Sequence, residues 1–108
     1  MLFSKTALAQ NTITITGKII ETKNGEPIEF ATVLVGDPIN QKPIVGTTTL
    51  QDGSFVLETT ASEFYIEVSF IGFTTQRFDN PTITNNKIEL GSVSISEDSQ
   101  QLDEVVVE

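Results

Sequence analysis

The sequence has no cysteine and no histidine among its 108 residues. Without cysteine there can be no disulfide and no thiolate nucleophile, and without histidine there can be no Ser-His-Asp triad. The absence of both also removes the usual ligands of structural zinc and the axial histidine of haem proteins. We therefore expect no catalytic site, no metal and no cofactor, and a protein that is not an enzyme.

Basic residues are also scarce. Six Lys and Arg stand against fifteen Asp and Glu, which gives a net charge of −9. This excess of negative charge repels nucleic-acid phosphates and anionic lipid headgroups, so nucleic acid is not an expected partner. The sequence also lacks any run of about 18 consecutive apolar residues, and we expect no membrane span in this stretch of chain.

Residues 1–10 have some features of an export signal. The sequence ALAQ at positions 7–10 resembles a signal-peptidase cleavage site, which has small residues at two alternate positions. Only the first three residues of the chain form an apolar run ahead of it, and a signal peptide usually has a longer one. Two interpretations stay open: residues 1–10 are the end of a signal peptide, or they are a disordered N-terminus.

Residues 11–95 have the pattern of one all-β domain. Alternating apolar and polar residues, rich in Ile, Val and Thr, predict seven strands near residues 12–19, 30–35, 44–49, 54–59, 64–70, 74–78 and 88–95. Asn24-Gly25 and Asp52-Gly53 indicate tight turns. The apolar phase slips by one residue at Gly91, which predicts a β-bulge. Since no segment has helical periodicity, we expect a β-sandwich.

The inward phase of these strands predicts the core. We expect the strand at 64–70 to lie at its centre, because its alternation is the clearest. The strand at 30–35 is apolar on both faces and is expected to be a central one. The predicted core residues are Ile13, Ile15, Ile19, Val33, Phe55, Leu57, Ile66, Val68 and Phe70.

Three motifs, in order along the chain, resemble those of carboxypeptidase-regulatory-like domains. They are GKIIE with GEPI and ATV over residues 17–33, GTTTLQDGSF at 46–55, and VSFIGF at 68–73. The resemblance covers residues 13–95 and implies a seven-stranded Greek-key β-sandwich of the transthyretin, or prealbumin, type. Two features depart from the family pattern: Leu50 stands where an Asp is usual, and the loop at 36–43 is long.

The composition changes at residue 96. Residues 96–101 contain no large apolar side chain and are predicted to be a mobile acidic linker within the segment 96–108. The linker is followed by an extended, β-branched segment consisting of Leu102, Asp103, Glu104, Val105, Val106 and Val107.

This last segment resembles the TonB box of TonB-dependent outer-membrane receptors, including the SusC-like importers of the Bacteroidota. The resemblance implies that the TonB C-terminal domain binds residues 102–107 as an added strand. It also implies that the plug and barrel of the same polypeptide follow Glu108, and that this domain lies on the periplasmic side of the outer membrane.

Several alternatives stay open. The sandwich could instead belong to a cell-surface adhesin or serve as an accessory domain of a secreted enzyme. Residues 105–107 could be the last strand of the sandwich, or could pair with a sheet edge of the same or a neighbouring copy. Tyr65, Phe70 and Phe73 could line a carbohydrate site, although such aromatics usually pack within a sandwich.

Overall fold

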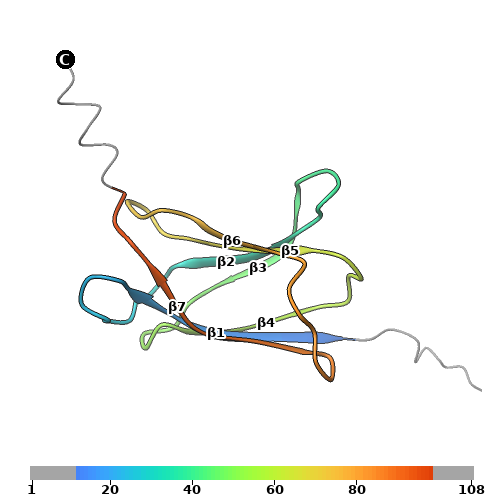
Figure 1. Cartoon of the computed structure of the whole chain (residues 1–108), viewed down its shortest axis with the longest axis horizontal. Helices are drawn as coiled ribbons and strands as arrows, with labels where there is room; N and C mark the ends of the chain where they lie inside the picture. The colour runs from blue at the N-terminus through green and yellow to red at the C-terminus, as the bar shows by residue number, and fades with distance from the viewer. Residues whose placement is uncertain (1–11, 99–108) are drawn as a thin grey trace, which may run out of the picture.

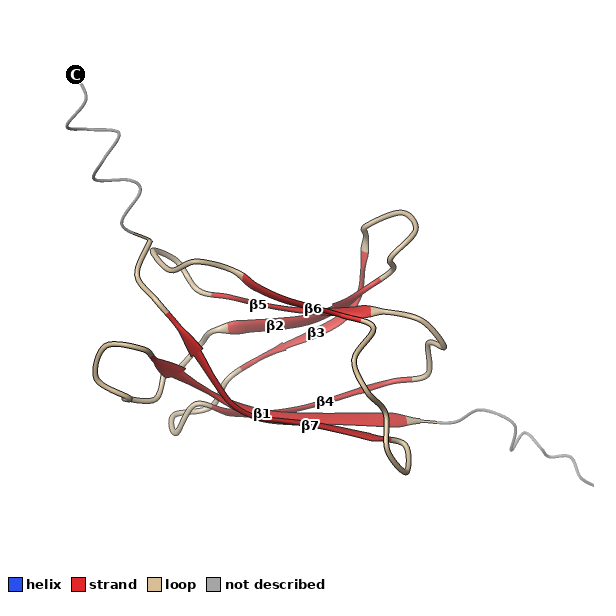
Figure 2. Ribbon diagram, viewed as in Figure 1, coloured by secondary structure: helices blue, strands red, loops and turns tan. Residues whose placement is uncertain are grey.

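The computed structural model describes residues 12–98, which form two packed β-sheets (Figure 2). None of these residues lies in a helix, and this part of the chain therefore contains no helix that could cross a bilayer. The strands are β1 (Ile13–Glu21), β2 (Thr32–Gly36), β3 (Pro43–Thr48), β4 (Ser54–Thr59), β5 (Tyr65–Ser69), β6 (Gln76–Asp79) and β7 (Lys87–Ile95).

The strands divide into a three-stranded sheet, in the order β4-β1-β7, and a four-stranded sheet, in the order β3-β2-β5-β6 (Figure 1). The connections β1 to β2, β3 to β4, β4 to β5 and β6 to β7 cross between the sheets. Pairing is antiparallel except between β1 and β7, which run parallel. The all-β, seven-stranded sandwich expected from the sequence is confirmed, and β2 is central, as predicted.

The core lies between the sheets and is built from the inward side chains of β1, β2, β4, β5 and β7. Eight of the nine predicted core residues are buried, and Phe70 is the exception. The backbone turns at Phe70, where the Phe73 N–H donates to the Phe70 carbonyl at 2.9 Å, so this side chain leaves the sheet. Phe70 is half-buried, and its ring lies 5.6 Å from that of Phe73.

The predicted bulge at Gly91 is confirmed. Thr16 pairs with Glu89 and Lys18 pairs with Ser92, so β7 contains one more residue than β1 over this interval. Gly91 has a φ of 70°, a conformation that glycine adopts without a steric penalty. The bulge keeps Ile88 and Val93 on the same buried face despite the phase slip in the sequence.

Tyr65 is buried although its strand phase points it away from the core. Its ring packs so closely on Gly36 that any side chain at position 36 would overlap it. The Arg77 guanidinium covers the other side, 3.7 Å from the ring centroid, and is held by Asp79 at 2.9 Å and by Gln41 at 2.8 Å. Tyr65 is therefore a packing residue, and the three aromatics considered for a carbohydrate site do not form an exposed platform.

Candidate functional site

The segment predicted to bind TonB, Leu102 to Val107, lies outside the described residues, as do residues 1–10. The structure does describe the point from which that segment continues. Figure 1 places the end of the described chain at one end of the sandwich, next to the β5–β6 turn, and the β1–β2 and β3–β4 turns lie at the same end. We call this the exit end and define it by residues 22–31, 50–53, 70–73 and 96–98.

Backbone hydrogen bonds hold the chain at the exit end beyond the last strand. The Ile95 carbonyl accepts from the Thr22 N–H at 2.9 Å, and the Ser96 carbonyl accepts from the Thr74 N–H at 2.8 Å. The Asp98 N–H donates to the Gly72 carbonyl at 2.8 Å. Residues 96–98, which composition assigned to a mobile linker, are thus hydrogen-bonded to the β5–β6 connection of the four-stranded sheet. Composition cannot predict this, because the partners are backbone groups far away in the sequence.

A four-residue turn, Ile28 to Ala31, forms the middle of the exit end. The Thr49 hydroxyl is buried inside this turn, where it donates to the Ile28 carbonyl at 2.6 Å and accepts from the Ala31 N–H at 2.9 Å. The Thr49 carbonyl accepts from the Phe30 N–H at 3.1 Å. These bonds hold Phe30 at a φ of 68° with 67% of its surface exposed. The sequence had placed Phe30 in a strand, but β2 begins two residues later, at Thr32.

Thr49→Val should destabilise the domain. Valine preserves the shape but leaves the Ala31 N–H and the Ile28 carbonyl buried without a partner, at about 1–3 kcal/mol for each group. Urea unfolding followed by far-UV circular dichroism should show the loss. Thr48→Val is the matched control, because Thr48 is exposed, and its effect should stay within about 0.5 kcal/mol. Equal midpoints for the two variants would contradict this role of the Thr49 hydroxyl.

The Asp52-Gly53 turn closes another side of the exit end and confirms the turn predicted there. The Asp52 carboxylate accepts from the Ser54 hydroxyl at 2.6 Å and from the Ser54 N–H at 3.0 Å. Gly53 has a φ of 82°, and a side chain there would come within 2.6 Å of the Ile19 carbonyl oxygen. These contacts assign Asp52 a structural role in the turn.

The two hydrogen bonds from Ser54 lower the pKa of the Asp52 carboxyl below its ordinary value of 3.8. A folded-state pKa below the unfolded one means that the carboxylate stabilises the domain above the unfolded value. That contribution is lost as the pH falls through the folded-state pKa. In Ser54→Ala we expect the pKa of Asp52 to rise towards its ordinary value, measured by NMR titration of the carboxyl carbon. An unchanged pKa would contradict the assignment.

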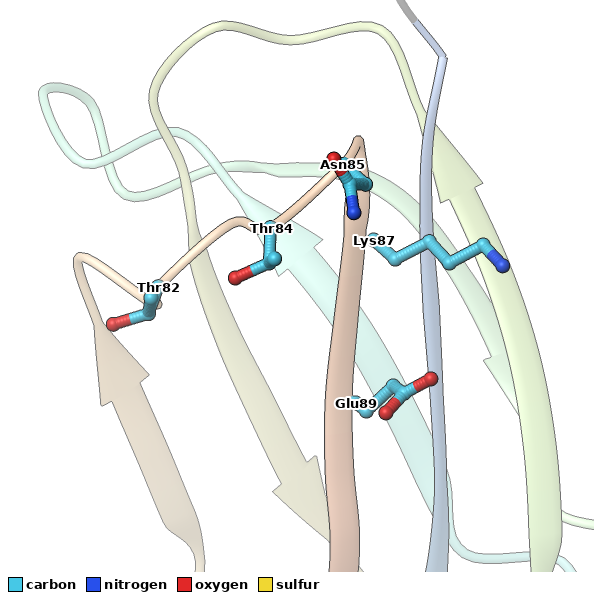
Figure 3. Close-up of a pocket in the computed structure, with 5 residues that line it drawn as sticks. All are labelled: Thr82, Thr84, Asn85, Lys87 and Glu89. Atoms are coloured by element: carbon cyan, nitrogen blue, oxygen red, sulfur yellow. The ribbon is translucent and has the colours of Figure 1, made fainter.

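A polar hollow of about 510 Å³ lies at the opposite end of the sandwich, lined by Thr82, Thr84, Asn85, Lys87 and Glu89. Figure 3 shows the two threonine hydroxyls on one side of the β6–β7 turn, while Lys87 and Glu89 extend to the other side of β7. The polar groups therefore do not converge on a common point where a substrate atom could be held. This arrangement does not resemble a nucleophile with its base, which lie within hydrogen-bond reach of each other.

The exit end, in contrast, brings together apolar side chains that are exposed to solvent. Phe30, Leu50 and Ile71 expose 67%, 64% and 89% of their surfaces. They come from three different loops, and nothing in the local sequence signals that they gather at one end.

Solved structures with a similar fold belong to proteins of several kinds. They include a 3-chlorocatechol 1,2-dioxygenase from Rhodococcus opacus 1CP (TM-score 0.58, 8% identity) and a 9R-lipoxygenase from Cyanothece PCC8801 (0.56, 12%). A third is the group B streptococcus pilus 2b backbone protein (0.50, 13%). They cover 83%, 87% and 82% of this chain, which spans 61%, 18% and 42% of theirs. At these identities the likeness shows the fold alone.

Sequence comparison is more specific. No curated protein sequence gives a significant match. The family model of the CarboxypepD_reg-like domain, however, matches residues 15–107. This match runs from Ile15, the third residue of β1, through β7 and on through the segment after it, and the chain therefore belongs to the CarboxypepD_reg-like domain family.

Proposed function

We propose that this chain is the non-catalytic, periplasmic N-terminal module of a TonB-dependent outer-membrane receptor, with residues 102–107 as its TonB box. The observation that carries the proposal is the position of this segment relative to the fold. Seven strands form a two-sheet sandwich within residues 12–98, and residues 102–107 follow the last of these strands in the chain. The family match nevertheless continues through residue 107.

The sequence of the segment suits strand addition. Val105, Val106 and Val107 are β-branched, and no proline interrupts residues 102–107. Such a segment can pair with an exposed sheet edge of another protein, where main-chain hydrogen bonds provide affinity and side-chain pockets provide specificity. In this proposal the exposed edge belongs to the TonB C-terminal domain, and the plug and barrel follow Glu108 in the same polypeptide.

The anchored exit end gives a pull on residues 102–107 a defined point of attachment. Leu102 follows Asp98 by four residues, and Asp98 is bonded to the β5–β6 turn. If TonB pulls on residues 102–107, the force is therefore transmitted to the sandwich through a short connection. The sandwich would then act as a folded body beside the coupling segment, which is a binding and regulatory role.

Isothermal titration calorimetry of the whole chain with the purified TonB C-terminal domain tests this proposal. We expect binding by the intact chain and none by a chain that lacks residues 102–107. A deletion of the same length at the other end, of residues 2–7, serves as the matched control and should leave binding unchanged. Equal binding by the chain without residues 102–107 would contradict the proposal.

A further inference from the structure

We infer that the exit end is a second contact surface for the protein that holds residues 102–107, and that it takes a cationic, partly apolar protein surface. The inference rests on the proposed function, in which that protein is the TonB C-terminal domain. It adds a folded binding surface to the extended segment, so that the partner recognises both.

The apolar part of this surface consists of Phe30, Leu50 and Ile71. The hydrogen bond between the Phe30 N–H and the Thr49 carbonyl places Phe30 beside the residue that precedes Leu50. The pairing of Thr32 with Ser69 places the turns that contain Phe30 and Ile71 at adjacent strand ends. Three large apolar side chains that gather at one end and stay in water are typical of a protein contact site.

The conformation of Phe30 is a second, independent observation. Its φ of 68° is rare for a bulky residue, and turns that need a positive φ usually contain Gly or Asn. Strain of this kind persists only where the surroundings impose it, and it concentrates at binding sites. Here the two hydrogen bonds of the buried Thr49 hydroxyl impose it. The domain thus keeps Phe30 exposed in a strained backbone conformation, and aromatic residues are enriched at the centre of protein interfaces.

Charge indicates the chemistry of the partner. The four segments of the exit end contain five acidic residues and one lysine, Lys23. The acidic residues that flank the apolar side chains are Glu26, Glu29, Asp52, Glu97 and Asp98. A surface with apolar residues at its centre and acidic residues around them is complementary to a partner surface with apolar residues surrounded by Lys or Arg. The opposite charges also accelerate association between the two surfaces.

Chain length brings the partner to this surface. Leu102 lies four positions after Asp98, and a fully extended chain advances at most about 3.3–3.6 Å per residue, or roughly 14 Å over this interval. A folded domain bound to residues 102–107 is therefore tethered next to the exit end. The tether makes the second contact effectively intramolecular, so even a weak surface contributes to the overall affinity.

Phe30→Gly tests the inference, because it removes the aromatic side chain and also relieves the backbone strain. Glycine adopts the required φ freely, so the melting temperature should be unchanged or raised. We expect the Kd for the TonB C-terminal domain to rise about tenfold, as for an aromatic at a contact centre. A residue with only a structural role would not combine a retained melting temperature with weaker binding.

Two matched pairs of variants separate the exit end from the rest of the surface. Ile71→Ser should weaken binding, whereas Ile39→Ser should not, since Ile39 is equally exposed (87%) but lies in the β2–β3 loop at the opposite end. Glu29→Lys should slow association, whereas Glu63→Lys in the β4–β5 loop should not, although both change the net charge equally. Stopped-flow kinetics in low salt measures this second pair.

The outcomes distinguish the inference from the proposed function. Loss of binding on deletion of residues 102–107, with Phe30→Gly, Ile71→Ser and Glu29→Lys all equal to the wild type, would overturn the second contact and leave the TonB box intact. Binding that is unaffected by the deletion would overturn the proposed function and, with it, this inference. Loss on deletion together with weakening by the exit-end variants alone supports both.

Discussion

Val68→Asp should abolish cooperative folding of the domain. Val68 is fully buried in β5, where it pairs with Val33 of β2 and Gln76 of β6. An aspartate there would place an unpaired carboxylate in the apolar core, at a cost of several kcal/mol. A domain of this size has a total stability of roughly 5–15 kcal/mol, so most or all of it would be lost. Far-UV circular dichroism with urea and thermal unfolding measures the effect.

Val56→Asp is the matched control, because it introduces the same substitution on an outward position. Val56 lies on β4 with 62% of its surface exposed, and a carboxylate there stays in water. We expect this variant to unfold cooperatively, with a midpoint close to that of the wild type. If Val68→Asp behaved in the same way, the strand register and the position of the core would both be wrong.

If the proposed function holds, Val106→Pro should abolish energy-dependent uptake by the TonB-dependent receptor that we propose this chain belongs to. Proline has no backbone N–H, so it removes one hydrogen bond from the strand that residues 102–107 are proposed to add to TonB, and its ring disfavours pairing at that position. Because residue 106 lies beyond the seven strands, the sandwich should stay folded. Uptake of the receptor's substrate, measured with and without a protonophore, should fall to the de-energised level.

Val106→Ile is the control for this experiment, since it retains both the N–H group and the β-branched side chain. Uptake with this variant should match the wild type. If uptake persisted in Val106→Pro and also after deletion of residues 102–107, this segment would not be the TonB box. The result would favour the alternatives, an adhesin module or an accessory domain of an enzyme.

Much of the fold can be predicted because it follows from local patterns. Strand alternation directly reflects which side chains face the core, and it predicted the burial of Ile15, Ile66 and Val68. The phase slip at Gly91 likewise reflects the bulge. Each of these signals lies within a few residues of the feature it predicts.

The errors have tertiary causes. Phe30 belongs by propensity to a strand, but the hydroxyl of Thr49, nineteen residues later, ends the pairing there. Tyr65 is outward by phase and yet buried, because Gly36 leaves room for its ring and Arg77 covers it. Such effects override local propensity and cannot be deduced from it.

The candidate site also has one part that the sequence predicts and one part that it does not. The extended segment at 102–107 could be proposed from composition and from its resemblance to a TonB box, since its features are all local. The exit end could not, because its apolar residues come from three loops that meet only in the folded domain. Their proximity depends on the pairing of β2 with β3 and β5.

The central claim is that residues 102–107 pair as a strand with the TonB C-terminal domain. NMR of the ¹⁵N-labelled chain titrated with that domain tests it most directly, because each backbone amide is observed separately. The account predicts shifted resonances and slowed hydrogen exchange at residues 102–107, further shifts at the exit end, and unchanged amides in the core at Ile66 and Val68. Amides at 102–107 that neither shift nor gain protection at saturating TonB would contradict the account.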